Sequence, residues 1–139
     1  MAGQRPVGWW VRRLDELLEQ GLDDVVAAEG LTRRHWQVLE SLAGGPVPRA
    51  DLHAVLGPFA APGDVDAVLA DLAGRGWAAG DAAPSLTPAG RAAHERLAAA
   101  VGAFRRGVAD GLTAEEYAAT VAGLARMVAN LEGGAQLRR

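Results

Sequence analysis

Three short stretches decide the fold: LTRRHWQVL at residues 31–39, LADLAGRGW at 69–77 and SLTPAGR at 85–91. In the first, Thr32 can cap a helix whose apolar residues follow at helical spacing. The second is a helical pattern that ends in Gly-Arg-Gly before an aromatic residue. In the third, Thr87 and Pro88 form a strong helix start signal. Residues 80–83 supply a turn between two very short predicted strands, 77–79 and 84–86.

Helical periodicity continues on both sides of this region. The first predicted helix covers residues 7–29, with Gly30 as its stop signal. Its apolar stripe consists of Val7, Val11, Leu14, Leu18, Leu22 and Val25. The other predicted helices cover 32–43, 48–56, 62–75, 87–110 and 113–132, and in the third of the six Leu52, Val55 and Leu56 face inward. Thr113 and Glu116 predict a capping box for the last helix, and Gly133-Gly134 predicts its end.

The composition favours one globular domain spanning residues 1–139. Half of the residues are apolar, which is enough for a sizeable core. The net charge is -3, and all 14 basic residues are arginine, so the chain has no global basic character. The absence of cysteine excludes disulfides, thiol catalysis and thiolate metal sites. We expect a cytoplasmic protein without a signal peptide or a membrane span.

The order and spacing of these elements resemble the multiple-antibiotic-resistance regulator (MarR) family of bacterial transcription factors, from about Trp9 to Leu131. The matching pieces are Leu31-Thr32 with Trp36-Gln37-Val38-Leu39, Leu72 with Gly76, Leu86-Thr87 with Gly90-Arg91, and Gly111-Leu112-Thr113 with Glu116-Tyr117 and Leu124 with Met127. The resemblance implies a mainly α, winged helix-turn-helix fold of six helices and a short two-stranded wing. The DNA-binding lobe would cover about 31–90, and the dimerisation helices about 6–30 and 88–132.

The same resemblance implies a mode of action. Members of the family are homodimers whose two lobes contact a pseudo-palindromic operator in double-stranded DNA. Many bind a small amphipathic or aromatic ligand between the lobe and the dimerisation helices, which releases the DNA. These are the partners that the resemblance implies for this chain.

The predicted DNA-reading surface departs from the family in its charge. Aligned with the family pattern, the exposed start of the recognition helix is Gly63, Asp64, Asp66 and Ala67, where members usually carry Ser, Thr, Gln or Arg. Asp64 lies in the first turn, where its negative charge stabilises the helix through the helix dipole, whatever the function of the protein. A carboxylate at a base edge can also accept a hydrogen bond from cytosine N4. Attraction to phosphate must then come from other residues, for which the candidates are Arg33, Arg34, Arg49 and Arg75.

A ligand cleft is predicted between the first, second and fifth helices, at Trp10, His35, Trp36 and His94. Aromatic rings suit amphipathic ligands, and the resemblance places these helices along the cleft. The alternative is that Trp36 fills the core and that the histidines are ordinary surface or core residues. Because the three histidines of the chain lie on three separate helices, no metal site is predicted.

The sequence contains no enzyme signature and predicts no cofactor. Adjacent carboxylates such as Glu115-Glu116 point apart on a helix, and neither Ser41 nor Ser85 lies in a nucleophile elbow. Two functions remain. The first is a dimeric, ligand-responsive, DNA-binding regulator, which the family pattern favours. The second is a winged-helix dimer with weakened or lost DNA binding that serves as a ligand-binding or protein-interaction module. The acidic recognition helix favours it, and so does the short wing, which lacks the acidic-basic pair and minor-groove arginine of the family.

Overall fold

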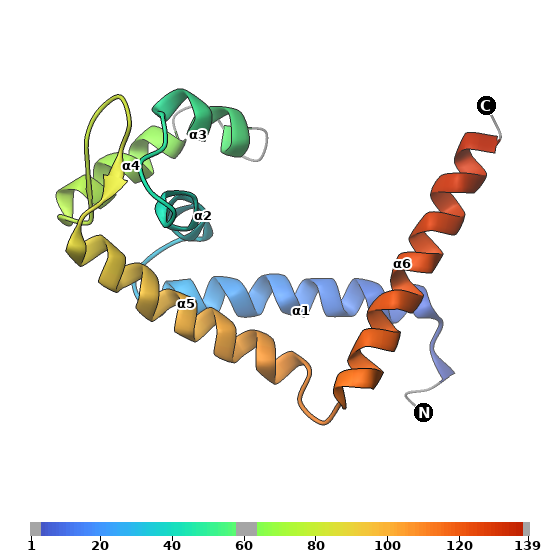
Figure 1. Cartoon of the computed structure of the whole chain (residues 1–139). Helices are drawn as coiled ribbons and strands as arrows, with labels where there is room; N and C mark the ends of the chain where they lie inside the picture. Colours follow the sequence, from blue (N-terminus) through green and yellow to red (C-terminus); the bar gives the residue numbers. More distant parts are fainter. Residues whose placement is uncertain (1–3, 58–63, 138–139) are drawn as a thin grey trace. The chain divides into compact units, whose positions relative to one another are not determined.

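The computed structural model describes residues 4–57 and 64–137. Within these ranges the elements are α1 Val7–Ala27, α2 Arg33–Leu42, α3 Arg49–Leu56, α4 Asp64–Gly74, β1 Ala78–Ala79, β2 Ser85–Leu86, α5 Pro88–Val108 and α6 Ala114–Leu137 (Figure 1). The predicted mainly helical winged helix-turn-helix fold is confirmed. By its internal contacts the chain divides into two compact units, the first ending at Phe104 within α5 and the second beginning at Arg105.

The wing is as short as the sequence predicts. Strands β1 and β2 are antiparallel, with Ala78 opposite Leu86 and Ala79 opposite Ser85. Residues 80–83 form the connection between them. A two-residue ladder provides few hydrogen bonds, and an isolated hairpin is at best marginally stable in water. The wing therefore depends on its contacts with the helices.

Two of the predicted helix starts, at Thr32 and Thr113, are confirmed by their capping bonds. The Thr32 hydroxyl oxygen accepts from the His35 backbone amide, and His35 Nδ1 accepts from the Thr32 amide at 3.1 Å. At the start of α6, the Thr113 amide donates to Glu116 Oε1 at 2.9 Å, and the Glu116 amide donates to Thr113 Oγ1 at 3.0 Å. Each reciprocal pair satisfies two amides that the first helical turn leaves without a partner.

Two helices end through glycines in the left-handed conformation. Gly30 has φ 73° and Gly76 has φ 76°, values that a residue with a side chain rarely adopts. After Gly76 the Trp77 amide donates to the Leu72 carbonyl at 2.9 Å, which closes the last turn of α4. The Gly-x-Gly-aromatic sequence is thus a helix terminus that turns the chain into the wing.

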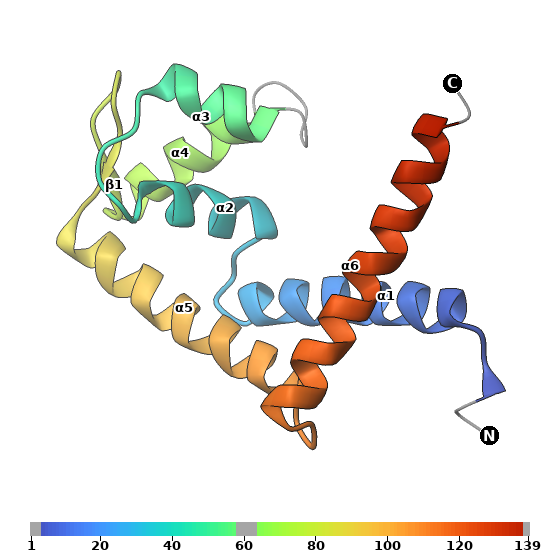
Figure 2. The ribbon, with the colours of Figure 1, turned by 45° about the vertical axis from the view of Figure 1, so that its right-hand side comes forward.

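The core of the first unit is built around α2. In both views α2 lies between the α3–α4 pair and α5 (Figure 2). Leu39, Leu42 and Leu72 are completely buried there, and Leu52 of α3 is nearly so. The other buried apolar residues of this cluster are Val26, Leu31, Trp36, Val38, Leu56, Val65, Val68, Leu69, Ala78, Leu86, Leu97 and Val101. This packing fixes α4 and the wing on one side of the lobe.

Three local predictions are wrong. Val55 does not face inward, because its side chain is 65% exposed. The strands exclude Trp77 and Pro84, since the Trp77 amide is still bonded to the end of α4. Helix α6 continues through Gly133-Gly134 to Leu137. Glycine inside a helix costs only about 1 kcal/mol relative to alanine, and neither of these glycines has a positive φ.

Candidate nucleic-acid interface

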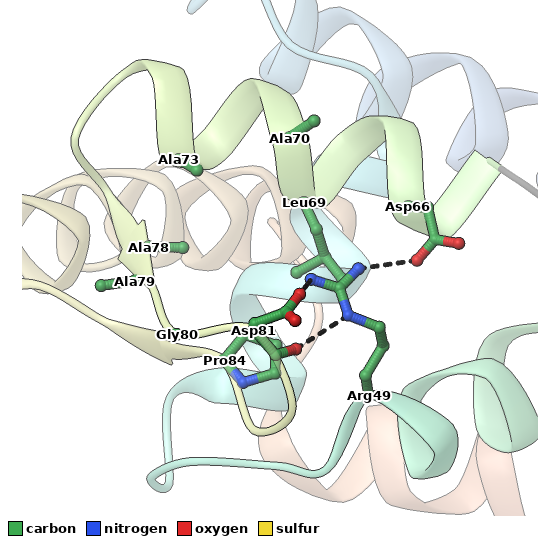
Figure 3. A pocket seen from close by; sticks show the side chains of 10 residues that line it. All are labelled: Arg49, Asp66, Leu69, Ala70, Ala73, Ala78, Ala79, Gly80, Asp81 and Pro84. Atoms are coloured by element: carbon green, nitrogen blue, oxygen red, sulfur yellow. Dashed lines mark hydrogen bonds and ion pairs between the residues drawn. The ribbon is translucent and has the colours of Figure 1, made fainter.

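A small hollow opens between α4, the wing and the start of α3, with a volume of about 260 Å³ (Figure 3). Its floor consists of small side chains from α4 and β1, among them Ala70, Ala73 and Ala78. Arg49 lies at one end, between Asp66 of α4 and Asp81 of the wing turn. In a winged helix this side of the lobe carries the recognition helix and the wing.

The Arg49 guanidinium is held by both of its neighbours. Nη1 donates to Asp66 Oδ1 at 2.7 Å, and Nε donates to the backbone carbonyl of Asp81 at 2.9 Å. Nη2 lies 3.5 Å from the Asp81 carboxylate, whose side chain is fully exposed. The side chain of Arg49 itself is 32% exposed. Arg49 therefore connects α3, α4 and the wing.

Asp66 is the acceptor shared by two basic groups of α3. His53 Nε2 lies 2.9 Å from the same Oδ1 atom that accepts from Arg49. The hydrogen bond from Arg49, followed by the one from His53, holds the pKa of the Asp66 carboxyl below its ordinary value. Because Arg49 and His53 are four residues apart on one helix, they face the same way, and this spacing is the sequence signal that could have indicated a shared partner.

Arg75 has a similar arrangement at the end of α4. Its Nε donates to Asp71 Oδ2 at 2.9 Å, and its guanidinium lies 5.2 Å from the centre of the Trp77 ring. His35 Nε2 of α2 lies 2.8 Å from the same carboxylate oxygen. The hydrogen bonds from Arg75 and then from His35 lower the pKa of Asp71.

The remaining two candidate arginines lie at the start of α2. Arg33 forms ion pairs with Glu19 and Asp23 of α1, and the hydrogen bond to Glu19 is the main cause of its raised pKa. Arg34 donates from Nη1 to the backbone carbonyl of Leu56 at 3.1 Å. All four arginines predicted to attract phosphate thus make contacts within the chain, and Arg33 and Arg34 line a different hollow from Arg49.

The predicted base-reading positions lie on the exposed side of α4. Asp64, Asp66 and Ala67 are exposed. Gly63 lies outside the described residues. Asp64 belongs to the first turn of the helix, as predicted, where its negative charge is attracted by the positive end of the helix dipole.

The four residues predicted to bind a ligand are placed differently from one another. Trp36 is buried and stacks on His94, with ring centres 5.5 Å apart and planes at 8°. His94 Nε2 lies 2.6 Å from Glu40 Oε1. Trp10 is 42% exposed on α1 and contacts the edge of Trp9. His35 is occupied by the cap of α2 and by Asp71.

Neither of the two hollows described above is lined by these four residues, and their ligand role stays a prediction. Sequence reasoning missed the carboxylates that bind the histidines, Glu40, Asp66 and Asp71, because each lies on another helix. Residues 4–57 and 64–137 contain no group of three or more metal-binding side chains. No helix in these ranges has the length and apolar character needed to span a bilayer.

No sequence-family model and no curated protein sequence matches the chain. Solved structures do match it. The DNA complex of the Mycobacterium tuberculosis MarR family protein Rv2887 is 26% identical, with a TM-score of 0.73 over 89% of this chain and 98% of the other. The complex of Rv2887 with p-aminosalicylic acid is 25% identical, with a TM-score of 0.64 over 92% and 99%. Wild-type apo MarR from E. coli is 22% identical, with a TM-score of 0.68 over 89% and 96%.

These matches cover 89% to 92% of this chain. The capped α2, the glycine-terminated α4, the two-residue wing strands and the Thr87-capped α5 follow one another in the order that the family motifs predict. The chain therefore has the winged helix-turn-helix fold of MarR family proteins, and it is similar in structure and in its sequence motifs to members of that family.

Proposed function

We propose that the chain is a DNA-binding transcriptional regulator that acts as a homodimer. The observation that carries this proposal is the structural match of 89% of this chain to a MarR family protein solved with DNA. In this proposal α4 enters the major groove with Asp64 and Ala67 toward the bases, and the wing lies beside it. Two lobes of one dimer would contact the two half-sites of a pseudo-palindromic operator.

The homodimer is supported by apolar surface that each unit leaves uncovered. The second unit consists of α6 and the last residues of α5, so no other element within this unit covers the apolar stripe of α6. Along that stripe Tyr117, Val121 and Val128 are 50%, 48% and 54% exposed. In the first unit, Val7 and Leu14 of α1 are 51% and 44% exposed. Exposed apolar faces of this extent are typical of an interface, and we assign them to a second copy of the chain.

We further propose that a small aromatic acid modulates the regulator. Rv2887 has been solved with p-aminosalicylic acid, which is the basis for choosing this probe. The predicted cleft residues Trp10 and Trp36 provide an intrinsic fluorescence signal. Addition of p-aminosalicylic acid should change this fluorescence, and Trp36→Phe should alter the response.

A second function is favoured by the charges of the recognition surface. Arg49 and Arg75 are both paired with aspartates, and Asp64 adds a further exposed negative charge. Few arginines then remain to neutralise phosphates, which supply most of the non-specific affinity for DNA. This observation favours a winged-helix dimer with weakened DNA binding that acts as a ligand-binding or protein-interaction module.

Fluorescence anisotropy with a labelled duplex from the region upstream of the chain's own gene separates the two functions. At about 50 mM salt, a regulator should bind this duplex more tightly than a scrambled duplex of the same length and composition. Equal binding of both duplexes, or none, would favour the second function. Light scattering on the same sample should give twice the chain mass of 14.4 kDa, and a monomer would contradict both proposals.

A further inference from the structure

The wing needs a support that its own strands do not provide. Its ladder joins only two residue pairs, and its connection carries no apolar side chain larger than alanine before Pro84. Pro84 is one of the most deeply buried residues of the chain, so the base of the wing is anchored. The turn that carries Asp81 is exposed and needs another attachment.

The segment before α3 provides the first part of that attachment. The Val47 amide donates to the Pro84 carbonyl at 3.1 Å, and the Arg49 amide donates to the Ala82 carbonyl at 2.8 Å. The two donors advance by two residues along the chain while their two acceptors go back by two residues. This is the hydrogen-bond pattern of antiparallel strands. Residues 47–48 and the amide of Arg49, the first residue of α3, therefore lie along the edge of the wing.

The Arg49 side chain provides the second part. Its Nε bonds to the Asp81 carbonyl in the wing turn, while Nη1 bonds to Asp66 on α4 (Figure 3). A guanidinium is planar and carries five donors in a fixed arrangement, so one side chain can bind acceptors on two elements at a defined angle. His53 binds the same Asp66 oxygen and restricts that carboxylate further.

We propose that Arg49 is a positioning residue that sets the wing against the recognition helix, and that it is not a phosphate contact. This inference rests on the proposed DNA-binding function. It also assigns Asp66 to the support of the wing, which leaves Asp64 and Ala67 as the exposed base-reading positions of α4. The acidic character of the helix then has a partly structural origin, because Asp66, one of its two N-terminal aspartates, binds Arg49 and His53.

The first test uses the free protein and needs no DNA. In Arg49→Gln the amides of Val47 and residue 49, which donate to the wing, should exchange their hydrogens about threefold to tenfold faster than in the unmodified chain. Arg91→Gln, the same change at an exposed position of α5, is the matched control and should leave these amides unchanged. Unchanged exchange in Arg49→Gln would overturn the positioning role, whether or not the chain binds DNA.

The second test separates positioning from phosphate contact. If Arg49 positions the wing, Arg49→Gln weakens DNA binding but leaves the slope of log K against log salt unchanged. If Arg49 neutralises a phosphate, the slope falls by about 0.9 for each copy of the residue in the complex. Asp66→Asn should reproduce the faster wing exchange of Arg49→Gln, and the double variant should exchange no faster than either single variant. A reduced slope, or additive effects of the two substitutions, would overturn the proposal.

Discussion

Gly90 allows the start of α5 to lie directly against Trp77, the residue before β1, and Gly90→Ala tests this close approach. A methyl group at position 90 would overlap the Trp77 carbonyl oxygen and would lie 2.8 Å from the carbonyl carbon and 3.1 Å from the Trp77 Cα. These are backbone atoms, so no side-chain rotation relieves the overlap. The same carbonyl accepts a hydrogen bond from the Thr87 amide at 2.9 Å.

The expected loss of stability follows from three contributions. Carbon atoms normally rest at about 3.5–4.0 Å, so the contact with the Trp77 carbonyl carbon alone requires Trp77 and the start of α5 to separate by roughly 0.7 Å or more. Overpacking of this kind costs about 1–3 kcal/mol. Weakening of the Thr87–Trp77 hydrogen bond adds about 1 kcal/mol to this loss of stability. The higher helix propensity of alanine reduces the loss by up to about 1 kcal/mol. We expect Gly90→Ala to lower the free energy of unfolding by about 1–3 kcal/mol.

Urea denaturation followed by circular dichroism at one fixed protein concentration measures this change. Gly107→Ala is the control, because Gly107 lies on the same helix and a methyl group there meets nothing within 4 Å. This control should be neutral or more stable by up to about 1 kcal/mol. If Gly90→Ala were as stable as Gly107→Ala, the steric explanation for this glycine would be refuted.

Three other substitutions test the core, the ion pairs and the dimer. Leu39 is completely buried, so Leu39→Ala should lower the unfolding free energy by about 2–5 kcal/mol in the same urea assay. The folded-state pKa values of Asp66 and Asp71 lie below the ordinary 3.8, so the unfolded chain binds protons more readily at low pH. The stability that these carboxylates provide is present above that value and is lost as pH falls below it, and Asp71→Asn should reduce the loss measured by acid titration. Val121→Asp on α6 should convert the dimer to a monomer in light scattering, because it places a charge in the proposed interface.

Each of these expectations has a result that contradicts it. A loss below about 1 kcal/mol in Leu39→Ala would mean that the residue is not enclosed by the core. An acid titration of Asp71→Asn identical to that of the unmodified chain would exclude the Arg75 and His35 contacts as a source of stability. A dimer that survives Val121→Asp would place the interface elsewhere, and Thr120→Asp, a change at an exposed neighbouring position, serves as its control.

The order of the elements was readable from the sequence because their boundaries depend on residues close together in the chain. Thr32 with His35, and Thr113 with Glu116, lie three residues apart, so the bonds that start α2 and α6 form within one turn. The left-handed turn at Gly76 likewise follows from one residue type at the end of one helix. Val55 was expected to face inward with Leu52 and Leu56, but it is exposed. The spacing of apolar residues indicates which side of a helix is buried, and it does not indicate how much of that side other elements cover.

The partners of the charged residues were decided only by the tertiary structure. Arg49 was predicted to attract phosphate, and the structure places it between Asp66, 17 residues away, and the Asp81 carbonyl, 32 residues away. His94 meets Glu40 across 54 residues. The sequence by itself determined the helices, the caps and the family motifs, because these depend on backbone geometry and side chains within a few residues. Which carboxylate neutralises which arginine depends on the packing of α2, α3 and α4 around the buried leucines, since ion pairs act over a few ångströms in space and are independent of separation along the chain.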